Sequence, residues 1–159
     1  MPGRDTAECV WGYLRVHTAA AALRAMIYDG ANNIYESGDL TPERLQDALD
    51  ARRTAGQLTR ALAISVQDAG EDPTRQSGVR TQDVVVRVFD RMRGYHNIRT
   101  ARIELMRILR GFFDNLTSSS EQGVLQMEYS GRTGHRFDQM YAVEYEAISY
   151  TSRVTFMED

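Results

Sequence analysis

The stretch QDVVVRVFDRMRGYHNIRTARIELMRILRGFF, Gln82 to Phe113, decides the fold of this chain. In its first part Val84, Val86 and Val88 alternate with less uniform residues, which predicts a β-strand with one apolar face. From Asn97 onward, apolar residues recur at steps of three and four, which predicts an amphipathic helix. The apolar stripe of this helix consists of Ile98, Ala101, Leu105, Ile108, Leu109 and Phe112.

The composition around this stretch is that of an ordinary globular domain. The chain has 159 residues, 42% hydrophobic and 26% charged, so we expect a single domain over 1–159 with a substantial core. No apolar run is long enough to cross a bilayer, and MPGRDTAEC lacks the apolar core of a signal peptide. We therefore expect a soluble intracellular protein without membrane contact. Its lone cysteine, Cys9, cannot form an internal disulfide.

An N-terminal helical part is predicted over 6–56. The broad apolar surface of 6–28 predicts a first helix that packs against more than one neighbour. Thr41 followed by Pro42 and Glu43 then marks the start of a second helix, because a hydroxyl cap, a proline and a carboxylate all favour a first turn. This helix is expected to end near Arg53.

The sheet and the long helix are predicted over 60–156. Besides the valine strand, alternating residues predict strands at Leu62–Val66, Leu125–Tyr129 and Tyr141–Tyr150, the last extending toward Phe156. The predicted fold class is α+β: an antiparallel four-stranded sheet packed by a long helix and an N-terminal helix, in the order ααββαββ.

The connections between strands carry predictions of their own. Asp68–Gly78 is rich in turn formers, so we expect an exposed, mobile loop. Ser130–Arg136 is interpreted as a glycine-bearing hairpin tip, and Arg132, His135 and Arg136 would make that tip a cationic contact point for an acidic partner. In the last strand the apolar parity shifts toward Ile148, which predicts a bulge or a bend.

The sequence contains no complete catalytic or metal-binding pattern. Three histidines, His17, His96 and His135, fall in different predicted elements and lack ligand spacing. Glu144 and Glu146 share a strand face and could hold a hard cation, although a solvated outer face is the simpler interpretation. We therefore expect no metal, no cofactor and no enzymatic activity.

Charge is distributed unevenly along the chain. Residues 75–110 contain nine arginines and three carboxylates, whereas 111–159 contain three arginines and eight carboxylates. The chain has no lysine. The two regions could attract each other within a chain or between copies.

The long helix also has an unusual second face. At about 100° per residue, four arginines lie opposite the apolar stripe, with three large apolar residues among them. The arginines are Arg99, Arg102, Arg107 and Arg110, and the apolar residues are Ile103, Met106 and Phe113. Such a face is typical of an interface core with an arginine-rich rim, or of a helix buried on both sides.

The order of elements resembles that of the tail terminator and tail completion (neck) proteins of long-tailed bacteriophages. The resemblance covers about residues 60–156 and rests on the pair LAISVQ and DVVVRVFD, the helix NIRTARIELMRILRGFF and the final YAVEYEAISYTSRVTF. It implies a virion structural protein that forms a ring, usually a hexamer, at the head-proximal end of the tail tube. It also implies the tail tube protein and the head–tail connector or neck proteins as partners.

Within such a ring, the helix arginines could face carboxylates such as Glu144 and Glu146. Two alternatives stay open at this point. Another neck or head-completion adaptor would share the ring but bind the portal. A small nucleic-acid-binding module would use the arginines on phosphates, so direct DNA contact is also open.

Overall fold

A computed structural model describes residues 6–27, 29–36, 39–54, 63–73, 79–91, 95–116, 124–139 and 143–155. The helices are α1 (Thr6–Val16), η1 (Thr18–Ala20), α2 (Ala21–Ala25), η2 (Gly30–Asn33), α3 (Pro42–Thr54) and α4 (Tyr95–Leu116). The strands are β1 (Ile34–Glu36), β2 (Ala63–Pro73), β3 (Val79–Asp90), β4 (Val124–Arg132), β5 (Arg136–Asp138) and β6 (Val143–Thr155).

The strands form one sheet in the order β1-β2-β3-β6-β4, and β5 also pairs with β6. The four long strands are antiparallel, as predicted, and register Val84 opposite Tyr150 and Val86 opposite Ile148. Short β1 adds a parallel partner to β2. The predicted α+β class and the order of its main elements are therefore confirmed.

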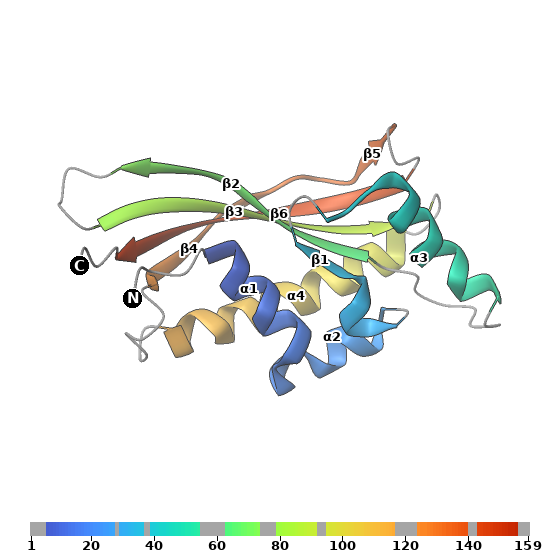
Figure 1. The fold of residues 1–159 in the computed structure, drawn as a ribbon, viewed down its shortest axis with the longest axis horizontal. Coiled ribbons are helices and arrows are strands. Elements are labelled where there is room, and N and C mark those ends of the chain that lie inside the picture. The colour runs from blue at the N-terminus through green and yellow to red at the C-terminus, as the bar shows by residue number, and fades with distance from the viewer. Residues whose placement is uncertain are drawn as a thin grey trace.

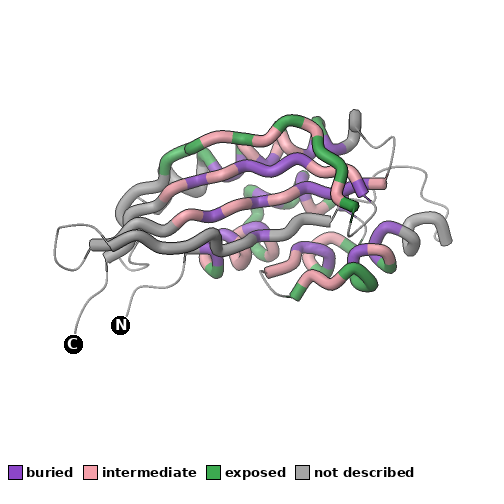
Figure 2. The backbone as a smooth tube through the Cα atoms, turned by 90° about the horizontal axis from the view of Figure 1, so that it is seen from above, coloured by how far each residue is buried: buried purple, intermediate pink, exposed green. Residues whose placement is uncertain are grey.

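The main core lies between one face of this sheet and the layer formed by α1, α2 and α4 (Figure 1). Val84, Val86 and Val88 are buried, and residues between them in β3 are partly exposed, because successive side chains of a strand point to opposite faces. Figure 2 shows this alternation along the central strands. Helix α4 lies below the sheet in Figure 1, and its apolar stripe belongs to the same core as these valines.

Helix α3 forms a second, smaller core at one end of the sheet. Its Leu45 and Leu49 are buried with Phe89 and Val143. Phe89 follows Val88 directly and so points away from the main core. The Thr41 hydroxyl accepts a hydrogen bond from the Arg44 amide at 3.2 Å, which confirms the predicted start of this helix.

The prediction of one continuous helix over 6–28 is wrong. The first helix ends at Val16, and His17 adopts an extended conformation with φ −73° and ψ 142°. The His17 Nδ1 accepts a hydrogen bond from the Ala19 amide and so caps the 3₁₀ turn that follows. Because the chain changes direction here, Val16 is 78% exposed although its neighbours in the apolar pattern are buried.

The loop predicted at Asp68–Gly78 is also wrong over most of its length. The β2–β3 ladder continues to Pro73 opposite Arg80, with a register shift between Asp68 and Gly70. Paired backbone groups stabilise this arm despite its turn-forming composition. Residues 74–78 lie outside the described part of the chain.

The bulge predicted in the last strand lies in its neighbour. β6 pairs with β3 without a shift from Glu144 to Thr155, whereas β4 shifts register twice, the second time between Tyr129 and Gly131. Gly131 has φ +153°, a backbone conformation that favours glycine at such a bulge.

The segment predicted as a hairpin tip instead runs along the edge of β6. The Thr133 amide donates to the Ala147 carbonyl at 2.9 Å, and the Ala147 amide donates to the Thr133 hydroxyl at 3.0 Å. Thr133 thus bridges β4 and β5, and the chain does not turn back until after β5.

Candidate interaction surface

The long helix α4 has two faces of different character. Its apolar stripe, from Ile98 to Leu109, is buried against the sheet and against α2. The opposite face exposes Arg99, Ile103, Arg107 and Arg110. Ile103 is 53% exposed, which is unusual for an isoleucine. We call Arg99, Ile103 and Arg110 the exposed stripe of α4.

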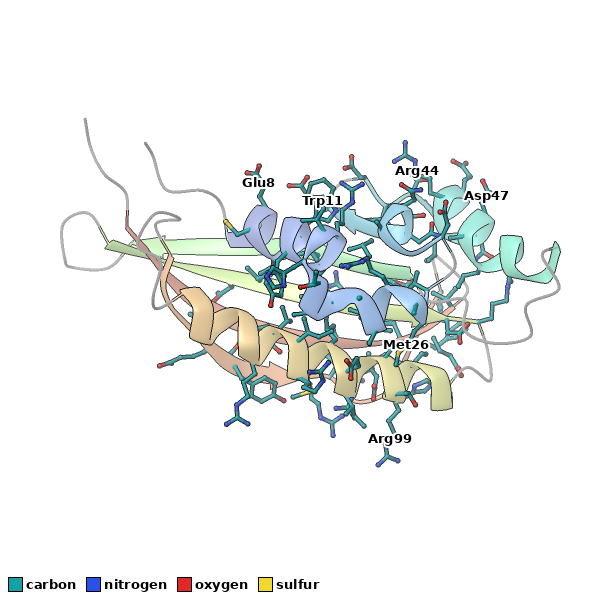
Figure 3. All side chains as sticks on the ribbon, turned by 90° about the horizontal axis from the view of Figure 1, so that it is seen from below. Glu8, Trp11, Met26, Arg44, Asp47 and Arg99 are labelled. Atoms are coloured by element: carbon teal, nitrogen blue, oxygen red, sulfur yellow. The ribbon has the colours of Figure 1, made fainter. Side chains whose placement is uncertain are left out.

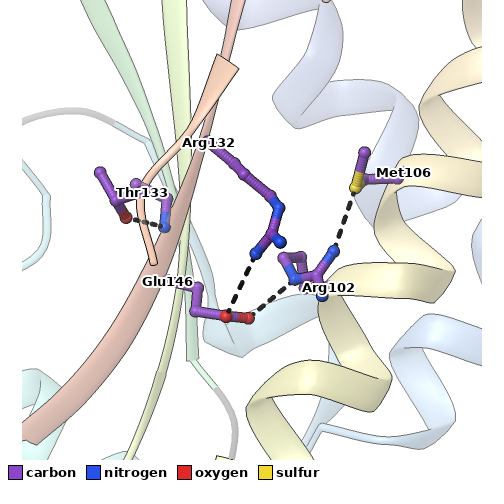
Figure 4. Close-up of polar contacts among 6 residues, drawn as sticks. Arg102, Met106, Arg132, Thr133 and Glu146 are labelled. Atoms are coloured by element: carbon purple, nitrogen blue, oxygen red, sulfur yellow. Dashed lines mark hydrogen bonds and ion pairs between the residues drawn. The ribbon is translucent and has the colours of Figure 1, made fainter. Parts of the chain in front are cut away.

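Arg102 lies at the boundary of the two faces and turns toward the sheet. Its Nε donates to the Glu146 Oε2 at 2.8 Å, and the two side chains are only 11% and 3% exposed. Its guanidinium also contacts the Met106 sulfur at 3.5 Å (Figure 4). The predicted attraction between the arginine-rich and acidic regions therefore includes a pair within one chain.

Arg132 adds a second cation to Glu146. Its guanidinium lies 3.7 Å from the Glu146 Oε1, and its side chain is 43% exposed (Figure 4). Burial of a carboxylate is costly unless cations and donors compensate it, so Glu146 needs these partners. The result is a charged link between α4, β6 and β4. Glu146 faces the helix layer, and the outer-face interpretation of this residue is wrong.

A second pair of polar side chains joins the segment between β4 and β5 to strand β6. The His135 Nε2 is 3.3 Å from the Glu144 Oε1. Arg136, in β5, is exposed. Of the three residues assigned to the supposed tip, Arg132 and His135 thus lie beside carboxylates of β6.

Arg107 pairs with Glu104 one turn away on α4. The hydrogen bond from Arg107 lowers the pKa of the Glu104 carboxyl below its ordinary value, although partial burial opposes that shift. Such an exposed pair along a helix stabilises the helix only slightly. The last predicted residue of this face, Phe113, lies in α4, but its side chain is outside the described part of the structure.

A polar pocket that the sequence analysis missed lies between η2 and α3. Its volume is about 360 Å³, and it is lined by Asp29, Asn32, Asn33, Tyr35, Arg44, Asp47 and Ala48. The sequence around Gly30 and Asn32 indicated only a helix break, and no local pattern connects it with α3. The two segments lie on either side of β1 in the sequence, and β1 is paired in parallel with β2.

Hydrogen bonds shape this pocket. The Tyr35 hydroxyl donates to the Asn33 Oδ1 at 2.8 Å, and the Asn32 amide group donates to the Asp29 Oδ2 at 3.1 Å. Burial raises the pKa of the Tyr35 hydroxyl. The nearby Arg44 guanidinium lowers this pKa, whereas the carboxylates of Asp47 and Asp29 raise it. The pocket thus contains two carboxylates and one guanidinium.

In the described ranges, no group of three or more histidine, cysteine, aspartate or glutamate side chains could hold a metal ion. Among the helices of the described part of the chain, none combines the length and the apolar character of a bilayer span. The fold and its surfaces define an α+β protein with an arginine-bearing helix face and a separate polar pocket.

No protein-family model and no curated protein matches this sequence. Among solved structures, the chain is similar to one described as "Virion of native gene transfer agent (GTA) particle". The two chains are 15% identical and superpose with a TM-score of 0.54, and the match covers 94% of each. At this identity the likeness shows the fold.

Proposed function

We propose that this protein is a structural, non-enzymatic component of a phage-like virion. The observation that carries the proposal is the fold shared over 94% of both chains with a chain of a gene transfer agent virion. The independent resemblance of the element order to tail terminator proteins supports the same class. The protein would then be located in the virion and assemble with other virion proteins.

Within that class we propose the tail terminator role. Copies of the chain form a ring, with a hexamer as the expected form, on the head-proximal end of a tail tube. The ring stops tube growth and joins the tail to the head connector. A surface that exposes Ile103 among arginines supports this role, because apolar residues with an arginine rim are favoured where proteins meet.

The direct test combines mass in solution with electron microscopy. Purified protein is mixed with headless tail tubes, and the expected result is a ring at one end of each tube. Mass photometry of the protein alone shows whether the ring forms without the tube. A protein that stays monomeric and leaves every tube end bare would contradict the terminator role.

The alternative within the same class is another neck or head-completion adaptor, which the shared fold supports equally well. It would bind portal-containing heads in place of tubes, so the same experiment with tail-less heads separates the two. A nucleic-acid-binding module would instead show salt-sensitive binding to DNA with micromolar or tighter affinity. We expect no such binding, and fluorescence anisotropy measures it.

A further inference from the structure

Two surfaces of opposite charge lie on opposite sides of this protein. In Figure 3, Arg99 projects from α4 on one side of the helical layer, and Asp47 projects from α3 on the other. Asp47 belongs to the polar pocket and Arg99 to the exposed stripe of α4. A subunit with complementary surfaces on opposite sides can bind the next copy head to tail.

Within the described part of the chain, the two arginines of the exposed stripe differ from the other two arginines of α4 in their ion pairing. Neither Arg99 nor Arg110 has an ion-pair partner among the residues that the structure describes, whereas Arg102 and Arg107 are paired with Glu146 and Glu104. Arg99 and Arg110 are about 16 Å apart along the helix axis at 1.5 Å per residue. Ile103 lies between them and is 53% exposed.

The pocket supplies the opposite chemistry. Asp29 and Asp47 are both exposed and line it together. The guanidinium of Arg44 donates to the Asp39 carbonyl at 3.2 Å, so part of its bonding capacity is already used. A volume of about 360 Å³ is at the lower end of ordinary ligand pockets, and it is large enough to admit a side chain from a neighbour.

We propose that the exposed stripe of α4 docks into the Asp29–Asp47 pocket of a second copy of this chain. Arg99 and Arg110 face the two carboxylates, and Ile103 is covered between them. This inference rests on the proposed function, because it names the contact that repeats around the ring. The contact is heterologous, so it closes a ring when the rotation between copies permits.

The test uses two variants that each reverse one surface. Arg99→Glu with Arg110→Glu makes the stripe acidic. Asp29→Asn with Asp47→Arg leaves the pocket with two guanidinium groups and no carboxylate. Asparagine is chosen at position 29 because Asp29 has φ +51°, a conformation that asparagine tolerates well. Arg136→Glu is the matched control, since it reverses an exposed arginine outside both surfaces.

Each surface variant alone should self-associate at least about tenfold more weakly than the natural protein, because like charges then face each other. An equimolar mixture of the two should restore association. In that mixture every acidic stripe meets a basic pocket and every basic stripe meets an acidic pocket. Mass photometry measures the association, with tail tubes added if the ring forms only there. Circular dichroism checks that each variant is folded. Restored association in the mixture would show independently that both variants are folded.

The outcomes separate this inference from the function on which it rests. Association of both variants at the natural strength would overturn the docking contact and leave the terminator role intact. Loss in each variant without recovery in the mixture would also overturn it. Restored association without capped tube ends would support the contact and contradict the terminator role. If the natural protein never associates, with or without tubes, both proposals fail.

Discussion

Glu146 is the residue whose position has the clearest energetic consequence. Its side chain is 3% exposed and accepts from Arg102 at 2.8 Å. Loss of one partner of a buried pair leaves the other charge uncompensated. We therefore expect Glu146→Ala to lower the free energy of unfolding by about 3 kcal/mol, measured by urea denaturation.

A double-mutant cycle separates the interaction energy between Arg102 and Glu146 from the contribution of their packing to stability. Arg102→Met with Glu146→Leu removes both charges and fills the space with apolar atoms, so it should cost less than either single change. Arg132 tolerates the loss of Glu146 because its side chain is 43% exposed and reaches water. Additive effects of the two single changes would show that Arg102 and Glu146 are not coupled.

The exposed pair of Arg107 with Glu104 is the comparison. Because this pair is at the surface, Arg107→Ala should leave the urea midpoint unchanged.

Tyr150 gives a second prediction at this scale. Burial raises the pKa of its hydroxyl well above the ordinary value of 10.0, and Tyr129 adds to the increase. The unfolded chain releases this proton near pH 10 but the folded chain keeps it, so the free energy of unfolding falls as pH rises above about 10.

Tyr150→Phe should therefore make this alkaline loss of stability shallower. Urea denaturation between about pH 9 and about pH 11 measures it. The absence of lysine simplifies the experiment, because no lysine ammonium group titrates in this window. An unchanged pH slope would show that Tyr150 is not the group responsible.

At the scale of elements, the edge formed by β4 and β5 depends on Thr133. Its hydroxyl accepts from the Ala147 amide at 3.0 Å, and Ala147 is only 4% exposed. Thr133→Val keeps the shape and removes the acceptor, so we expect a loss of about 1 kcal/mol. The Ala147 amide should also exchange its hydrogen faster, as hydrogen–deuterium exchange measures. Thr133→Ser retains the hydroxyl and serves as the control, so exchange as fast as in Thr133→Val would contradict the assignment.

The same elements show what local sequence can and cannot predict. The valine alternation of β3 and the period of α4 are long enough to identify each element without knowledge of its neighbours. Strand β1 has only three residues and exists through its pairing with β2, which no local pattern encodes. The break at His17 depends on a cap bond between a ring nitrogen and a backbone amide, inside a segment whose apolar spacing is helical.

The candidate site divides in the same way. Periodicity predicted that Arg99 and Arg110 would lie opposite the apolar stripe, and they are exposed. It did not reveal that Arg102 reaches Glu146, because that contact spans 44 positions of the chain and depends on where the sheet lies. The pocket of Asp29 and Asp47 was missed for the same reason, since η2 and α3 meet only in the folded molecule.

For the whole molecule, the placement of its charges makes assembly and folding respond differently to salt. The proposed contact uses exposed arginines and carboxylates, and the Debye length falls from about 10 Å at 0.1 M ionic strength to about 3 Å at 1 M. Self-association should therefore weaken steadily with added sodium chloride. The Arg102–Glu146 pair is buried and screened much less, so the thermal midpoint of the subunit should change little. Mass photometry and thermal unfolding over one salt series measure the two responses. Association that grows stronger with salt would mean that burial of Ile103, rather than the arginines around it, dominates the contact.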